Sequence, residues 1–183
     1  MPSSDRPAAA PALQIDWLPV PGTRGQLGMT VCPGRRWAGA ADPDWLRDLD
    51  ADLRTIQDSG AGLLVTLMEA YELHEYGAGG LPLAVQSSPL DWLHLPIEDM
   101  CVPGPGFEQA WAFAGRMLRE RLTGGERIVM HCLAGLGRTG TVAARLLVEF
   151  GTPPPDAVQR VRAARPGAIQ SRVQLDYVLR LPF

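Results

Sequence analysis

A cysteine and an arginine stand six positions apart in the segment His-Cys-Leu-Ala-Gly-Leu-Gly-Arg-Thr-Gly, which begins at His131. The largely apolar residues 127–131 are typical of a strand, and residues 139–150 are typical of an amphipathic helix. Cys132 and Arg138 therefore lie in the turn between a strand and a helix. Successive backbone N–H groups in such a turn form a concave anion site, and the amino end of the helix adds positive potential. A guanidinium can hold two phosphate oxygens at once, so the pattern predicts a phosphate site that contains a thiol.

Other residues of this turn also suit a bound anion. Gly135 and Gly137 allow positive φ values and a close approach of the backbone to a ligand. The field that attracts phosphate also favours the thiolate form of Cys132, and a thiolate that faces a held phosphorus atom is a positioned nucleophile. A buried structural cysteine beside a helix-capping Thr139 is the alternative interpretation. The backbone N–H groups expected to hold the phosphate are those of Leu133, Ala134, Gly135, Leu136, Gly137 and Arg138.

Three segments resemble those of the cysteine-dependent protein tyrosine and dual-specificity phosphatases. Residues 131–140 match the family's His-Cys-(five residues)-Arg-Ser/Thr motif, and residues 94–99, His-Leu-Pro-Ile-Glu-Asp, resemble its general-acid loop. Residues 166–174, Pro-Gly-Ala-Ile-Gln-Ser-Arg-Val-Gln, are similar to its glutamine loop. Within the family, the stretch 25–181 is most similar to phosphatases of the kinase-associated (cyclin-dependent kinase inhibitor 3) type. We carry over the chemistry of that group and not its kinase partner.

The resemblance implies an enzyme that hydrolyses phosphoric monoesters in two steps through a cysteinyl-phosphate. Cys132 is the nucleophile, and Arg138 holds the phosphate. Asp99, which lies 33 residues before Cys132, is the general acid, because the leaving oxygen needs a proton. Glu98 is the rival for this role, since neighbouring side chains on an extended loop point in opposite directions. A turn-capping role for Asp99 is the structural alternative.

The resemblance assigns supporting roles to four more residues. Thr139 donates a hydrogen bond to the cysteine sulfur as it leaves, and His131 holds the loop. Gln170 and Gln174 orient the attacking water. A structural role competes for the second glutamine, because Ser171 followed by Gln174 is also the pattern of a capping box.

The expected fold is an α/β domain over residues 13–183, preceded by a flexible tail at 1–12. Strands are predicted at 15–20, 26–31, 63–67, 90–95 and 127–131, and helices from Asp42 through Ile56, from Phe107 through Leu122, and at 139–150, 154–164 and 171–181. A short helix or a loop is expected between Glu72 and Gly80. Alternating strands and helices predict a mostly parallel sheet covered on both faces by helices, with the ligand at the carboxyl ends of the strands.

Composition excludes several classes of protein. The net charge of −3 argues against a nucleic-acid partner, and no apolar run is long enough to span a bilayer. All 17 basic residues are arginines, so a catalytic lysine is excluded. The absence of lysine and asparagine suggests a GC-rich bacterial genome. With no secretory signal in residues 1–12, we expect a cytoplasmic protein, monomeric by default.

The three cysteines, Cys32, Cys101 and Cys132, form neither a disulfide framework nor a zinc motif. We expect no metal and no cofactor. Cys101 could form a reversible disulfide with Cys132 under oxidation, although a loop cysteine without a role is the plainer interpretation. Cys32 is expected to be packed.

A phosphorylated protein or peptide is the expected substrate. Phosphoinositide phosphatases commonly carry lysines in this loop, whereas Leu133, Ala134 and Leu136 are apolar, which disfavours a highly anionic substrate. The choice between phosphotyrosine and phosphoserine or phosphothreonine depends on pocket depth, so dual specificity is the default. The remaining alternatives are an arsenate reductase, a sulfurtransferase and a non-catalytic phospho-binding module.

Overall fold

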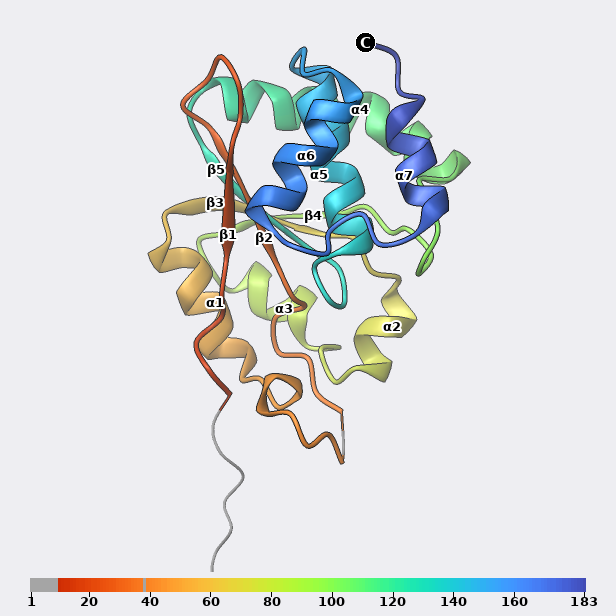
Figure 1. Cartoon of the computed structure of the whole chain (residues 1–183). Helices are drawn as coiled ribbons and strands as arrows, with labels where there is room; N and C mark the ends of the chain where they lie inside the picture. The colour runs from red at the N-terminus through yellow and green to blue at the C-terminus, as the bar shows by residue number, and fades with distance from the viewer. Residues whose placement is uncertain (1–9, 38) are drawn as a thin grey trace, which may run out of the picture.

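A five-stranded sheet forms the centre of the molecule (Figure 1). The computed structural model describes residues 10–37 and 39–183, so most of the predicted tail lies outside the described residues. The strands, in the order β1-β2-β5-β3-β4, are β1 (Asp16–Pro19), β2 (Gln26–Thr30), β5 (Arg127–His131), β3 (Ala61–Thr66) and β4 (Asp91–His94). β1 pairs antiparallel with β2, and every other pair is parallel. The predicted α/β fold with a mostly parallel sheet is confirmed.

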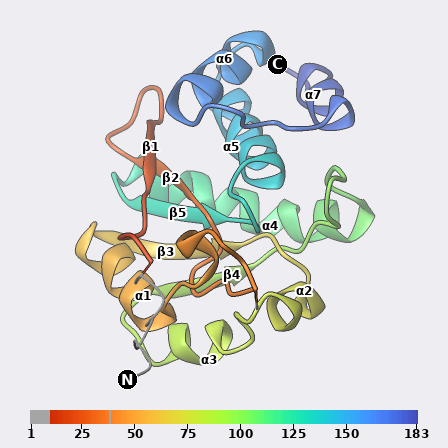
Figure 2. The ribbon, with the colours of Figure 1, turned by 60° about the horizontal axis from the view of Figure 1, so that its bottom comes forward.

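Helices cover both faces of this sheet, as Figure 2 shows. They are η1 (Pro43–Trp45), α1 (Leu49–Asp58), α2 (Ala70–Glu75), α3 (Leu81–Gln86), α4 (Pro105–Thr123), α5 (Gly137–Glu149), α6 (Pro154–Ala164) and α7 (Arg172–Leu179). α1 and α3 pack on one face, and α5, α6 and α7 form a layer on the other. α4 is joined to this layer where Trp111 donates a hydrogen bond to Glu149 at the end of α5.

Both faces of the two middle strands, β3 and β5, are buried. In β3 and β5, Leu64, Val65, Val129 and Met130 are all fully buried, as expected for parallel strands with helices on both faces. Since β5 lies between β2 and β3, the turn that follows β5 is flanked by the ends of two other strands. This topology places the Cys132 loop at the centre of the carboxyl edge of the sheet.

The helix predicted from Asp42 through Ile56 is in fact two elements. η1 ends at Trp45, and α1 starts only after Asp48, whose side chain accepts from the Ala51 amide. Between them Arg47 is buried in ion pairs with Asp44 and Asp52. A buried guanidinium needs such partners, and the chain departs from the helical path where it meets them. α3, in residues 81–86, was not predicted.

Candidate active site

Two arginines hold the outer side of the loop that follows β5. Arg35 Nη1 donates to the Leu133 carbonyl at 3.0 Å. Arg165 donates from Nη2 to the Ala134 carbonyl at 3.0 Å and from Nε to the Gly135 carbonyl at 2.6 Å. Three successive carbonyls thus accept from cations outside the loop. Because a trans peptide is planar, a carbonyl that points outward turns the next N–H inward.

The same pattern continues along the chain. The Leu136 carbonyl accepts from the Gly140 and Ile169 amides at 3.0 and 3.1 Å. Within the described residues, the amide groups of residues 133–138 donate to no protein acceptor. A row of inward N–H groups at the start of α5 is an anion-binding arrangement. The amides predicted from sequence to hold phosphate are therefore gathered in one loop.

The two loop glycines serve different purposes. Gly135 has a φ of 68°, and a Cβ there would lie 2.1 Å from the Thr30 carbonyl oxygen, so only glycine fits. The prediction of a positive φ at Gly137 is wrong. That glycine has the φ of an ordinary residue in α5, and a Cβ there would lie 3.0 Å from the Gln174 amide and 3.2 Å from Gln170. Gly137 thus leaves room for the two glutamines.

Arg138 is almost wholly buried and held from behind by a carboxylate. Its Nη1 and Nη2 donate to Glu72 at 2.7 and 2.9 Å, and Nη1 also donates to the Ile97 carbonyl at 2.9 Å. Asp99 Oδ1 lies 2.9 Å from Nη2. Burial alone would lower the pKa of Arg138, but the hydrogen bond to Glu72 and the nearby negative charges raise it. Arg138 Nε is buried and finds no hydrogen-bond partner among the described residues.

A cavity of about 210 Å³ brings the predicted residues together. It is lined by Trp45, Asp99, Met100, Cys132, Leu133, Ala134, Gly137, Arg138, Gln170 and Gln174. Thr139 follows Arg138 in α5, and its hydroxyl is buried with no hydrogen-bond partner among the described residues. The predicted bond from Thr139 to the Cys132 sulfur is therefore not made in this structure.

His131 is fully buried and joins a chain of side chains behind the loop. Trp92 Nε1 donates to the Thr66 hydroxyl at 2.9 Å, and that hydroxyl lies 2.8 Å from His131 Nε2. The hydroxyl accepts from the indole and has one proton of its own, which it can donate to Nε2 when the imidazole is protonated on Nδ1. Nδ1 lies 3.4 Å from the Cys132 carbonyl, which accepts its proton in that tautomer. Burial lowers the pKa of His131 to about 3, so the ring is neutral near pH 7.

The acid loop places Asp99, and not Glu98, in the Cys132 cavity. Glu98 and Cys101 line a separate cavity of about 470 Å³ on the other side of the loop. Met100 has a φ of 60°, which is unusual for a side chain of this kind. Its carbonyl accepts from the Ser171 hydroxyl at 3.3 Å. The loop is thus fixed by the start of α7.

The two glutamines differ in their freedom. Gln174 is fully buried: Oε1 accepts from the Ser171 amide at 3.1 Å, and Nε2 donates to the Cys101 carbonyl at 3.2 Å. Together with the Ser171 side chain it forms the capping box of α7. Gln170 is exposed and lines the cavity. Both reach the site, but Gln174 has structural duties there.

Comparison with known proteins identifies the family. Residues 38–152 match a family model described as "Polymorphic toxin system, DSP-PTPase phosphatase". The chain belongs to this family of dual-specificity protein tyrosine phosphatases. Such phosphatases are phosphoric monoester hydrolases, in agreement with the motif of residues 131–140.

Three related proteins match the sequence of this chain over different lengths. Cyclin-dependent kinase inhibitor 3 of Rattus norvegicus is 29% identical over 171 residues, which are 91% of this chain and 77% of that protein. The protein tyrosine phosphatase PRL-1 of Trypanosoma cruzi is 52% identical over 56 residues, 30% of this chain and 31% of that protein. The protein tyrosine phosphatase type IVA 3 of Bos taurus is 34% identical over 91 residues, 49% of each chain. The chain thus spans less than half of two of these three relatives.

Solved structures share the fold. Kinase associated phosphatase, with its catalytic-site cysteine replaced by serine, superposes with a TM-score of 0.82 at 24% identity, over 92% of this chain and 93% of that one. The active form of Tk-PTP gives a TM-score of 0.62 at 27% identity, over 84% and 88%. These matches agree with the topology and layers described above.

Sequence reasoning missed four residues that shape the site of this phosphatase: Glu72, Arg35, Arg165 and Trp45. None lies in a recognisable motif for its contact. The side chain of Arg35, for example, is only 6% exposed and pairs with Asp44. Whether a charged side chain is buried depends on the complete fold, and the local sequence pattern does not predict it.

No group of three or more His, Cys, Asp or Glu side chains suited to a metal ion occurs in residues 10–37 and 39–183. No helix in the same ranges is both long and apolar enough to cross a bilayer.

Proposed function

We propose that this chain hydrolyses phosphate monoesters on protein side chains through a covalent intermediate on Cys132. The observation that carries the proposal is the set of donors around the thiol that find no acceptor in residues 10–37 and 39–183. The amides of residues 133–138 and Arg138 Nε all belong to the loop that surrounds Cys132. A row of loop N–H groups beside a buried guanidinium is the arrangement that binds an oxyanion and stabilises the charge that develops on it.

In the first step the Cys132 thiolate attacks phosphorus and forms a P–S bond, while the P–O bond to the leaving group breaks. Asp99, protonated before this step, gives its proton to the departing oxygen. In the structure Asp99 is paired with Arg138 Nη2, so the phosphate must replace Asp99 as the acceptor of this nitrogen. The guanidinium then donates to the phosphate through Nε and Nη2, and Glu72 keeps its hydrogen bonds to the guanidinium on the side away from the phosphate.

In the second step water attacks the thiophosphate and the P–S bond breaks. Asp99, now a carboxylate, accepts the proton of that water. Gln170 is the better placed glutamine to orient it, because Gln174 is engaged in the α7 cap and the acid loop. Neither step needs a metal or a cofactor. We assign to Thr139 a hydrogen bond to the departing sulfur, because its buried hydroxyl has no other partner among the described residues. Neutral His131 lies with Nδ1 3.4 Å from the Cys132 carbonyl.

The substrate we propose is a phosphoprotein, with both phosphotyrosine and phosphoserine or phosphothreonine accepted. The apolar side chains of Leu133, Ala134 and Leu136 favour a single phosphate over a polyphosphorylated lipid headgroup. The named relatives include protein tyrosine phosphatases, and none of the observations favours arsenate reduction, sulfur transfer or simple phosphate binding. We further propose that residues 13–183 act as one catalytic domain, monomeric, in a bacterial cytoplasm.

The test is hydrolysis of a generic aryl phosphate with and without vanadate. We expect turnover that vanadate inhibits, since vanadate fits the same donors. Cys132→Ser should abolish turnover but still bind phosphate or vanadate, measured as a rise in melting temperature. Turnover by the serine variant close to that of the wild type would refute the scheme.

The role of Asp99 has its own test. Asp99→Ala should slow hydrolysis of alkyl phosphates by about 100-fold, within the range of general acid catalysis. Activated aryl phosphates should lose far less, because their leaving group needs no proton. Glu98→Ala is the matched control, with near-normal rates on both. Equal losses for the two substrate types would move the acid elsewhere.

A further inference from the structure

Three aromatic side chains stand together beside the catalytic cavity. The ring centroids of Trp37 and Trp45 are 6.0 Å apart, those of Trp37 and Tyr76 are 5.7 Å apart, and those of Trp45 and Tyr76 are 6.1 Å apart. Trp45 also lines the cavity that holds Cys132. The aromatic cluster is therefore continuous with the wall of the catalytic site.

The members of this cluster differ in what covers them. Arg35 lies over the Trp45 ring, 4.2 Å from its centroid, and fixes it in place. Trp37 is 55% exposed. Trp37 and Tyr76, with Glu75 and Arg36, line a hollow of about 300 Å³. Tryptophan is enriched among the residues that carry the energy of binding interfaces, so an exposed ring beside a catalytic cavity suits contact with a substrate.

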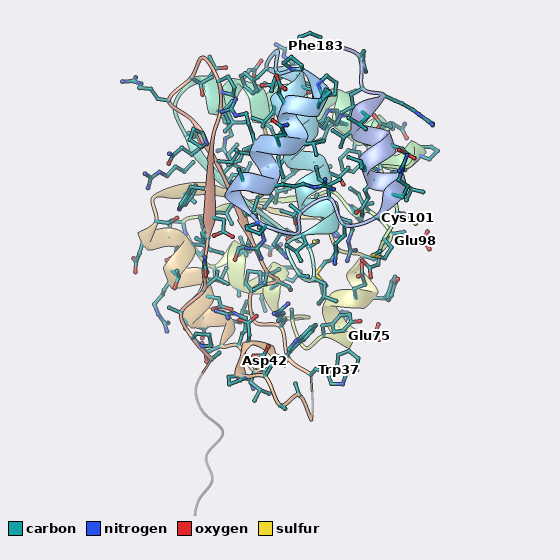
Figure 3. All side chains as sticks on the ribbon, viewed as in Figure 1. Trp37, Asp42, Glu75, Glu98, Cys101 and Phe183 are labelled. Carbon is teal, nitrogen blue, oxygen red and sulfur yellow. The ribbon has the colours of Figure 1, made fainter. Side chains whose placement is uncertain are left out.

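Glu75 is the one carboxylate that lines this hollow among the described residues, and Figure 3 shows it beside Trp37. Arg36 is the opposing charge, and its Nε is already bound to the Arg47 carbonyl at 2.8 Å. Burial first, and then the negative charges of Glu75, Asp99 and Glu72, raise the pKa of Tyr76, while the charge of Arg138 opposes them.

We propose that Trp37, Tyr76 and Glu75 form a subsite for an arginine or lysine side chain of the substrate, next to the phosphorylated residue. The subsite rests on the proposed phosphatase function and adds a sequence preference to it. Aromatic faces attract a cation and cover its aliphatic stem, and Glu75 supplies the counter-charge. Glu75 also repels an acidic side chain at this place, so the subsite selects against an acidic flank as well as for a basic one.

The test uses phosphopeptides in which one arginine is moved along an alanine background on either side of the phosphorylated residue. At one or two positions, arginine should raise kcat/KM by about tenfold over alanine, and glutamate should lower it, as expected for a partly exposed cation–π and ion-pair site. Trp37→Ala and Glu75→Gln should each remove most of the arginine preference. Both should leave hydrolysis of a small aryl phosphate unchanged, because that substrate does not reach the hollow. Phe113→Ala, which removes a 78% exposed ring on α4, is the matched control and should keep the preference.

Each outcome decides one of the two proposals. Equal rates for arginine, alanine and glutamate peptides, or a preference that survives Trp37→Ala, would overturn the subsite and leave the phosphatase function intact. Equal stimulation by leucine and arginine, insensitive to Glu75→Gln, would show an apolar subsite instead of a cationic one. If the wild type hydrolysed no phosphate ester, peptide binding to Cys132→Ser, followed by fluorescence anisotropy, would still test the arginine preference.

Discussion

The N–H donors of Arg138 serve two purposes: some bind a structural carboxylate, and the others are available to a ligand. An arginine has five N–H donors in a planar fork, and Glu72 takes one edge of this fork through both carboxylate oxygens. The side chain of Glu72 is 4% exposed, so the pair is buried. Glu72 also accepts from the Glu69 amide at 2.8 Å, which ties it to the start of α2. The carboxylate thus neutralises the arginine in the free enzyme and aims the remaining edge at the cavity.

Replacing Glu72 by glutamine tests this arrangement. Glu72→Gln leaves a buried guanidinium without its counter-charge, and we expect a loss of about 3 kcal/mol in the free energy of unfolding. Because Arg138 is then no longer held in position for the phosphate, kcat/KM for an aryl phosphate should fall by about 10- to 100-fold. Urea unfolding and steady-state kinetics measure the two effects. Glu120→Gln breaks an exposed pair with Arg116 and should change the free energy of unfolding by less than about 0.5 kcal/mol.

The contrast between Cys132 and Glu72 shows what a sequence can disclose about single residues. Cys132 and Arg138 are close in the chain, and the chemistry of their turn is local, so spacing alone predicted them. Glu72 and Arg138 are 66 residues apart. Their contact forms only after β3 and β5 have paired. Nothing in the sequence around Glu72, a glutamate in a short helix, predicts this contact.

At the scale of elements, the start of α7 links two functions. Its capping box satisfies the first amides of the helix, and the same side chains reach across to the acid loop. Ser171 binds the Met100 carbonyl, and Gln174 binds the Cys101 carbonyl. The capping-box interpretation of Gln174 is therefore confirmed, and its role toward the attacking water stays a prediction. α7 holds the loop that carries Asp99.

The two glutamines should fail in different ways. Gln170→Ala should leave stability within about 0.5 kcal/mol of the wild type, as for a surface change, and slow only the second step. Rapid mixing with an aryl phosphate should then show a stoichiometric burst of product followed by slow turnover. Gln174→Ala should cost about 1 kcal/mol of stability through the lost cap and, by loosening the acid loop, slow the first step so that no burst appears. Identical kinetics for both variants would argue against this division of roles.

Elements with clear periodicity were predictable, and the departures have physical causes. α4 and β5 follow directly from their apolar patterns. The break between η1 and α1 does not, because Asp42-Pro43 is a good helix start on its own. What interrupts the helix is the burial of Arg47 between Asp44 and Asp52, a tertiary requirement that overrides local propensity.

At the scale of the whole molecule, the site is tied to distant parts of the chain. Arg165, at the end of α6, grips the Cys132 loop and also pairs with Asp16 of β1 at 2.5 Å. Arg35 reaches the same loop from the segment after β2. The phosphate site therefore exists only when the complete fold is assembled. Fold class and site edge could be predicted from the alternation of strands and helices, but these ties could not, since they join residues that no periodicity relates.

The buried His131 couples this fold to pH. Burial lowers the pKa of its imidazole from 6.5 to about 3, so between these values the unfolded chain binds a proton that the folded chain does not. Stability is therefore fully present above pH 6.5 and is lost as pH falls toward 3, by about 2 kcal/mol at pH 5. His131→Gln keeps a neutral polar group and removes the titration. In urea unfolding at pH 5, 6 and 7, the advantage of the wild type over this variant should shrink by that amount as pH falls. A constant difference across the three pH values would show that His131 binds its proton in the folded protein over the same pH range as in the unfolded chain, and that the Trp92–Thr66–His131 chain does not hold a neutral ring.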